Sequence, residues 1–220
     1  MHNLTIGSCA AIALGVLFTN AGVASAFDWA EGVDLALPTV GPGDAEIVTG
    51  AGTLNSITGG LASGTDADLF RIYINNPAAF SARTDLSPGT LSDTQLFLFT
   101  VSGVGIAAND DGTGLGVKSQ LPVGNALYNA LPAGEYLIGL STFGLNPRYN
   151  SVDKIFTASM TGGLVAGPAS VSPLIEFGFT STPTGIGTYT ITLTGATGVP
   201  EPTSLAIVAS LAMVSLRRRR

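Results

Sequence analysis

Cysteine and histidine are nearly absent from this 220-residue chain, and their absence excludes the commonest catalytic chemistries. The only histidine is His2 and the only cysteine is Cys9. A mature chain that begins at Phe27 would contain neither, and so could form no disulfide, thiol nucleophile, Ser-His-Asp triad or zinc site with histidine or cysteine ligands. Catalysis would have to depend on carboxylates, lysine, tyrosine or serine, and we expect no enzymatic activity.

Charged residues are also scarce, at 11% of the chain, and basic residues are the scarcer kind. Four of the nine basic residues are the terminal Arg217–Arg220, whereas all fifteen acidic residues lie between Asp28 and Glu201. The part of the chain without its two ends therefore carries a net charge of −10. So acidic a body should repel nucleic acid and anionic lipid, and it suits cations. We expect no nucleic-acid partner.

Helical patterns are missing between residues 27 and 198, and strand patterns take their place. Residues 68–74 and 187–195 alternate between apolar and polar side chains, as half-buried strands do. Residues 94–101 are nearly continuously apolar, which predicts a central strand covered on both faces. About eight such strands separated by turn signals predict an all-β fold: an antiparallel β-sandwich of the jelly-roll or Greek-key kind.

The N-terminal segment Met1–Ala26 has the pattern of a secretory signal helix. Residues 10–18 form its apolar region, and Ala24 and Ala26 occupy the small-residue positions that signal peptidase prefers, which predicts a mature chain beginning at Phe27. No lysine or arginine precedes the apolar region, so an uncleaved N-terminal anchor stays open as the alternative.

The C-terminal segment has three parts: Pro200-Glu201-Pro202, the uncharged run Thr203–Leu216, and Arg217–Arg220. A helix over the fourteen uncharged residues would rise about 21 Å against a hydrocarbon core of about 30 Å. It predicts a weak membrane anchor whose arginines stay on the cytoplasmic side. The prolines favour an extended Pro-Glu-Pro that a processing enzyme could read. An ordinary tail anchor is the alternative.

These three parts, in this order, resemble a PEP-CTERM sorting signal, the tripartite bacterial signal that exosortases handle. The resemblance implies export to the cell envelope, cell surface or extracellular matrix, with transient inner-membrane anchoring through residues 203–220. It also implies cleavage near Pro200–Pro202 by an exosortase-type enzyme and association with exopolysaccharide. It specifies no molecular activity. The residues of the motif are Pro200, Glu201, Pro202, Arg217, Arg218, Arg219 and Arg220.

The body carries a second resemblance, through four segments in a fixed order. They are Asp66-Ala67-Asp68-Leu69-Phe70, Asp93-Thr94-Gln95-Leu96-Phe97-Leu98-Phe99, Asn109-Asp110-Asp111 and Leu131-Pro132-Ala133-Gly134-Glu135-Tyr136-Leu137. Over residues 55–145 the chain is similar to bacterial pre-peptidase C-terminal (PPC-like) domains, which implies a non-catalytic β-sandwich. The expected division is a signal peptide (1–26), a leader (27–54), the sandwich (55–195), a linker with the Pro-Glu-Pro motif (196–202) and the hydrophobic helix with its arginine tail (203–220).

Aspartates at strand ends and turns are the candidate metal ligands: Asp66, Asp68, Asp93, Asp110 and Asp111. Calcium takes six to eight oxygen ligands, which loops of Asp, Asn and backbone carbonyls can supply. The alternative is that these side chains bond to their own backbone at turns. We expect no required cofactor, with calcium as the candidate ion.

The expected function is a structural or adhesive role at the cell surface, and two alternatives stay open. One is a carbohydrate- or calcium-binding module. The other is a carboxylate-based glycoside hydrolase with Glu135 and Glu176 as its acids. Sugar sites use flat aromatic faces, and the candidates for such a face are Trp29, Tyr73, Tyr128, Tyr136, Tyr149 and Tyr189.

Overall fold

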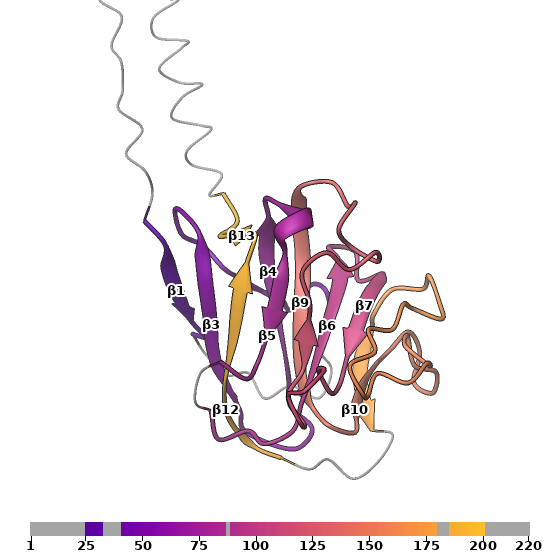
Figure 1. The fold of residues 1–220 in the computed structure, drawn as a ribbon. Coiled ribbons are helices and arrows are strands. Elements are labelled where there is room, and N and C mark those ends of the chain that lie inside the picture. Colours follow the sequence, from indigo (N-terminus) through magenta and orange to yellow (C-terminus); the bar gives the residue numbers. More distant parts are fainter. Residues whose placement is uncertain (1–24, 33–40, 87–88, 180–184, 201–220) are drawn as a thin grey trace, which may run out of the picture.

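The computed structural model describes residues 25–32, 41–86, 89–179 and 185–200, and this part of the chain is all-β (Figure 1). Within the described residues the only helical element is a single 3-10 turn, Pro77–Ala79. None of the described helices has the length and apolar character that a membrane crossing requires. The predicted C-terminal membrane helix, and the predicted signal helix up to residue 24, lie outside the described residues.

Two large sheets and one small sheet make up the fold. The first sheet has the order β1 (Phe27–Ala30), β3 (Leu54–Leu61), β12 (Gly187–Thr194), β5 (Ser81–Arg83) and β8 (Gln120–Leu121). The second has the order β13 (Ala196–Thr197), β4 (Ala67–Ile74), β9 (Gly134–Thr142), β6 (Thr94–Thr100) and β7 (Gly105–Asn109), and β2 (Glu46–Ile47) also pairs with β4. The small sheet pairs β10 (Leu145–Arg148) with β11 (Glu176–Phe179).

Strand pairing in the two large sheets is nested. Four of the antiparallel pairs form a nested set: β3 with β12, β4 with β9, β5 with β8, and β6 with β7. Strands β3 to β6 thus form one half of the arrangement, and the chain from β7 to β12 returns along them as the other half. Apart from β10 and β11 of the small sheet, successive strands on each half alternate between the two large sheets, except at the β6–β7 hairpin.

The sheets are mixed, which corrects the prediction of a purely antiparallel fold. Strand β1 pairs in parallel with β3, and β2 pairs in parallel with β4. Both parallel strands come from residues 27–54, the predicted leader. A segment as short as Phe27-Asp28-Trp29-Ala30 shows too few alternations to mark a strand, and a parallel edge strand gives no hairpin turn that could reveal its partner.

The first hydrophobic core lies between the two large sheets. Phe70, Ile72 and Ile74 of β4 are buried there, as their alternation predicts. They face the same core as Tyr189, Ile191 and Leu193 of β12, for which the prediction is also confirmed.

A second core covers the other face of the six-stranded sheet. Phe97 and Phe99 of β6 point into it and meet Phe156 and Phe177 from the segment 143–179. Strand β6 is therefore buried on both faces, which confirms the prediction drawn from its continuous apolar run.

The strands give the molecule two ends of different character. At one end, the terminal pole, Phe27 lies opposite Leu54, and the Val199 N–H donates to the Val48 carbonyl at 2.7 Å. Figure 1 shows the start of β1 and β13 together at this end. The other end, the acidic pole, is where β4 and β6 begin and β7 ends. Strands of seven to nine residues separate the poles by roughly 25 Å.

Candidate metal centre

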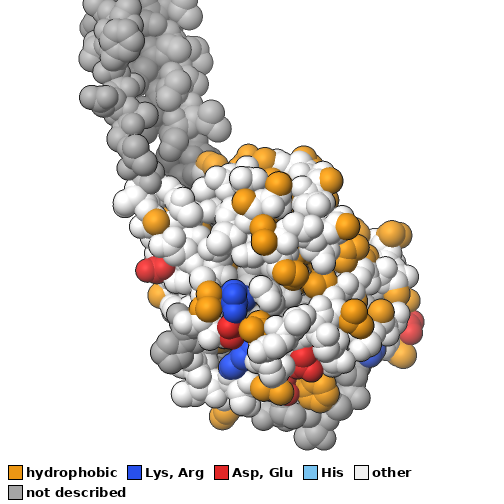
Figure 2. Space-filling view, viewed as in Figure 1, with side chains coloured by type: hydrophobic (Ala, Val, Ile, Leu, Met, Phe, Trp, Pro, Cys, Tyr) orange, Lys and Arg blue, Asp and Glu red, His pale blue; other side chains and the backbone are white. Residues whose placement is uncertain are grey.

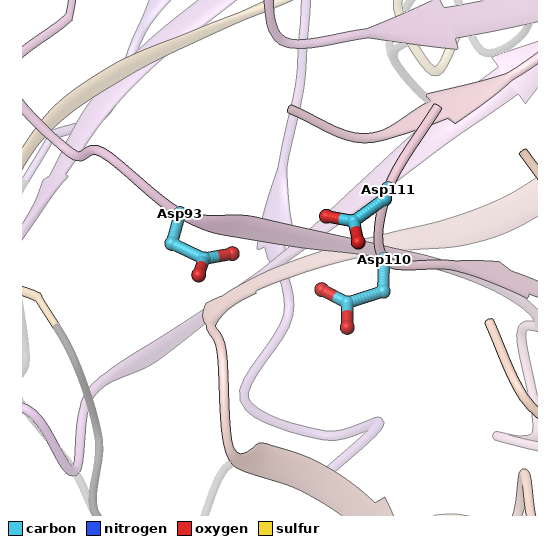
Figure 3. Close-up of side chains that lie close together, drawn as sticks. All are labelled: Asp93, Asp110 and Asp111. Carbon is cyan, nitrogen blue, oxygen red and sulfur yellow. The ribbon is translucent and has the colours of Figure 1, made fainter. Parts of the chain in front are cut away.

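Three aspartates meet at the acidic pole. Asp93 comes directly before β6, and Asp110 and Asp111 come directly after β7. Because β6 and β7 are antiparallel neighbours, the start of one strand lies beside the end of the other. One carboxylate oxygen from each aspartate lies within 4.8 Å of the other two. Figure 3 shows the Asp93 carboxylate facing those of Asp110 and Asp111 across this space.

The carboxylates differ in depth. Asp110 is only 3% exposed, whereas Asp93 and Asp111 are half-buried. The Oδ1 atoms of Asp110 and Asp93 are buried and, among the residues described, have no hydrogen-bond partner. A buried carboxylate oxygen without a partner loses its hydration, and a proton or a cation would compensate for that loss.

Burial and like charges alter the acidity of the centre. Burial first, then the charges of Asp111 and Asp93, raise the pKa of Asp110 to about 7, against a lowering hydrogen bond from Gln95. Burial also raises the pKa of Asp93, with Asp111 adding to the effect and Lys118 opposing it. Near neutral pH Asp110 is therefore partly protonated, and a bound cation could displace that proton.

The backbone around these carboxylates is held by other groups. The N–H groups of Asp110 and Asp111 donate to the Met160 carbonyl at 2.9 and 3.3 Å, and the Gly163 N–H donates to the Asp111 carbonyl at 2.6 Å. The Ser119 hydroxyl donates to the Asp110 carbonyl at 2.7 Å. The turn is thus fixed through its backbone, and the Oδ1 atoms of Asp93 and Asp110 have no partner among the described residues.

The donor set suits a hard cation. Carboxylate oxygens without histidine or cysteine favour calcium, magnesium or manganese over zinc and copper. Calcium accepts irregular geometry and six to eight oxygens, some of them from water, whereas magnesium requires near-ideal octahedral geometry. The three aspartates could therefore hold calcium from the protein side.

The other two predicted ligands lie elsewhere. Asp66 accepts a hydrogen bond from the Ala62 N–H at 2.7 Å, which is the turn-capping role that was the alternative to metal binding. Asp68 is buried and accepts a hydrogen bond from the Tyr189 hydroxyl. Asp68 points to the same side of β4 as Phe70, into the first core, whereas Asp93 shares its side of β6 with Phe97, in the second core. The five predicted aspartates therefore form two groups, separated by the six-stranded sheet.

Glu31, which sequence patterns did not single out, completes the second group. It follows β1, accepts a hydrogen bond from the Gly60 N–H at 3.0 Å, and hydrogen-bonds to Asp68. Burial, with added repulsion from Glu31 and Asp66, raises the pKa of Asp68 to about 9 despite the Tyr189 hydrogen bond. Asp68 is therefore protonated and neutral at physiological pH, and its proton takes part in the hydrogen bond to Glu31.

The aromatic candidates for sugar binding are mostly core residues. The Tyr136 hydroxyl donates to the Pro132 carbonyl at 2.8 Å, and the Tyr128 hydroxyl to the Pro122 carbonyl. Trp29 is half-buried and packs against the first core, as Tyr149 packs against the second. Phe143, which was not among the candidates, is 37% exposed and follows β9 at the acidic pole.

The two glutamates of the hydrolase hypothesis each lie beside an arginine. Glu135 forms an ion pair with Arg71 at 3.6 Å, and Glu176 stands opposite Arg148 in the β10–β11 pair. The two come from different sheets, and no contact among the described residues brings them together.

The processing residues are described only in part. Ala26 and Pro200 lie at the terminal pole: Ala26 precedes Phe27, whose N–H donates to the Thr53 carbonyl at 2.9 Å, and Pro200 follows Val199. Pro200 lines a pocket of about 400 Å³ with residues 50–52. The other predicted processing residues lie outside the described part: Ala24, Glu201, Pro202, Arg217, Arg218, Arg219 and Arg220.

Comparison with known proteins adds no assignment: no protein-family model matches the chain, and a search of curated proteins finds no relative. The two resemblances noted in the sequence, to a PEP-CTERM signal and to PPC-like domains, therefore stay predictions. Inference about function rests on the residues and their geometry.

Proposed function

We propose that this protein is an exported component of the cell surface or extracellular matrix, with a structural or adhesive role and no catalytic activity. The observation that carries the proposal is the order Pro-Glu-Pro, uncharged run and four arginines at the C-terminus. A PEP-CTERM/exosortase-type system would sort such a chain after signal peptidase releases its N-terminus. Exopolysaccharide is the proposed neighbour of the mature protein.

The arrangement of the poles supports this proposal. Both predicted processing points leave the body at the terminal pole, and Val199 is held there by its hydrogen bond to Val48. Only Pro200 separates this hydrogen bond from Glu201. A membrane anchor that follows would therefore keep the terminal pole near the bilayer and turn the acidic pole outward.

A jelly-roll sandwich is the finer fold that we propose. Its support is the nested pairing of β3 with β12, β4 with β9, β5 with β8 and β6 with β7. Four strands in each sheet, formed by one long folded-over hairpin, are what two linked Greek keys produce. The parallel edge strands β1 and β2 are additions to this frame.

Processing at both ends is the first testable consequence. In a host with an exosortase-type system, the protein should be recovered outside the cytoplasm, beginning at Phe27 and truncated near Pro200–Pro202. Changing Arg217–Arg220 to alanine should leave the C-terminal tail on the protein, because the cytoplasmic charges that position the anchor are lost. Lys154→Ala is the control for loss of a basic residue elsewhere. Fractionation with intact-mass measurement reads the result, and a cytosolic chain with Met1 and Arg220 both present would refute the proposal.

A calcium-binding module is the second candidate function, and it can be true together with the first. The observation that favours it is the buried, unpartnered Oδ1 of Asp110 facing two further carboxylates. The turn backbone is already held by Met160 and Gly163, so an ion could bind to the unpartnered carboxylate oxygens without rearrangement of the loop.

Calcium should therefore stabilise the purified full chain. At a hundredfold excess over Kd the gain is about 2.7 kcal/mol, which raises the melting temperature by roughly 5–10 °C. Asp110→Asn should abolish the shift, whereas Asp153→Asn, at an exposed position outside the centre, should keep it. Because calcium displaces the proton of Asp110, whose pKa is about 7, affinity should rise about tenfold between pH 6 and 8. An unchanged melting temperature in millimolar calcium would contradict the proposal.

A further inference from the structure

We propose that the acidic pole binds a neutral polysaccharide, with vicinal hydroxyls on the cation of the Asp93–Asp110–Asp111 centre and a sugar ring on Phe143. This inference rests on the calcium-binding function proposed above and deepens it by naming the ligand of that centre. It also assigns a role to Phe143, which none of the preceding functions uses.

The first argument is the open side of the centre. Asp110 is only 3% exposed and forms the buried side of the centre. Asp93 and Asp111 are half-buried and form the side nearer the solvent. Three carboxylates cannot by themselves supply the six to eight oxygens of calcium unless all bind through both atoms. The carbonyls of Asp110, Asp111 and Met160 already accept hydrogen bonds. Further ligands would therefore come from the solvent side, as water or as hydroxyl groups.

The second argument is charge. Three ionised aspartates with one divalent cation leave a charge of −1, which the nearby Lys118 offsets. The loaded centre is thus close to neutral, while the body around it is strongly acidic. A neutral polyol suits this balance better than a polyanion, which the surrounding acidic surface would repel.

The third argument is the apolar surface beside the centre. Thr142 pairs with Thr94, so the next residues outward, Phe143 and Asp93, stand opposite each other and share one face of the sheet. The Phe143 N–H donates to the Asp93 carbonyl at 3.4 Å, and the side chain is 37% exposed. Val117, 48% exposed, accepts the Thr94 N–H through its carbonyl at 3.2 Å.

An aromatic face next to polar ligands is what a sugar ring requires. The C–H face of a pyranose packs on an aromatic ring. Its hydroxyls need hydrogen-bonding groups or a cation at the rim of the same site. The space-filling view shows apolar and acidic side chains next to each other at the lower end of the body (Figure 2). The acidic pole combines both features, and it lies at the opposite end from the predicted anchor.

Retention of the purified full chain on beads carrying mannan, dextran or galactan tests the inference. We expect retention on at least one of these glycans in millimolar calcium and release by a chelator. Phe143→Ala should lower retention tenfold or more while keeping the calcium-induced rise in melting temperature. Asp110→Asn should lose both. Val171→Ala, at a position 83% exposed, is the matched apolar control and should lose neither.

The outcomes separate the two proposals. If calcium does not change the melting temperature, the calcium-binding function fails, and the glycan site fails with it. If calcium raises the melting temperature but none of the three glycans retains the protein, only the glycan inference is overturned. Binding to alginate oligosaccharides alone, or retention that Phe143→Ala leaves unchanged, would also overturn it, because the neutral-hydroxyl and ring-packing assignments would then be wrong.

Discussion

Replacing Asp68 by asparagine should stabilise the protein at neutral pH, and the gain should grow as the pH rises. In the folded protein burial raises the pKa of Asp68 from its ordinary 3.8 to about 9, so folding retains a proton that the unfolded chain releases. The contribution of Asp68 to wild-type stability should therefore fall between about pH 4 and pH 9. Asparagine carries no such proton, and its amide can still donate to Glu31 and accept the hydrogen bond of Tyr189.

Denaturant unfolding of the two proteins at several pH values measures this effect. The difference in unfolding free energy should increase by about 1.4 kcal/mol for each pH unit between pH 5 and 8, as an upper bound. Asp85→Asn is the control of opposite sign, because the Arg83 hydrogen bond lowers the pKa of Asp85. That variant should lose stability above the ordinary pKa of an aspartate. A pH-independent difference for Asp68→Asn would show that this carboxyl titrates normally.

Replacing Phe97 by alanine should cost about 3–5 kcal/mol of unfolding free energy and lower the melting temperature by roughly 10 °C. Phe97 is fully buried at the centre of the second core, with its ring 5.7 Å from that of Phe177 and 5.9 Å from that of Phe156. The cavity would loosen the contact between β6 and the segment 143–179, which also supplies Met160 to the turn of the metal centre.

Thermal and denaturant unfolding of Phe97→Ala and of a surface control measures how much the second core contributes to the unfolding free energy. Val152 is 73% exposed, so Val152→Ala should change stability by less than about 0.5 kcal/mol. Phe97→Leu, which keeps most of the apolar volume, should fall between the two. A loss below about 1 kcal/mol for Phe97→Ala would mean that the segment 143–179 contributes little to stability.

Strands with long alternation or continuous apolar runs were predictable from sequence, and strands defined by distant partners were not. The inward residues of β4 and β12, and the double burial of β6, follow from local pattern alone. Strand β10 contains Pro147, a residue that seldom lies within a strand. Its pairing with β11 depends on a contact across about thirty residues, which no local pattern records.

The candidate metal centre was predictable in part. Aspartates at strand ends drew attention to Asp93, Asp110 and Asp111, and the topology brings these three together. Sequence could not show that Asp66 and Asp68 belong to the other face of the sheet, because that depends on how strands from distant segments align. Glu31 and Phe143 were missed for the same reason. Each is a candidate only because it lies beside a residue far along the chain, Asp68 for Glu31 and Asp93 for Phe143.

If the chain is exported as proposed, the nested pairing of its strands limits when folding can be completed. The β6–β7 hairpin closes a short loop, whereas β3 meets β12 only when Tyr189, about 130 positions after its partner Gly59, is available. A chain threaded through a membrane from its N-terminus therefore cannot complete this fold until nearly all of the body has crossed. During such passage the inner β6–β7 hairpin could form early, whereas the outer β3–β12 pair could form only after its last strand had arrived.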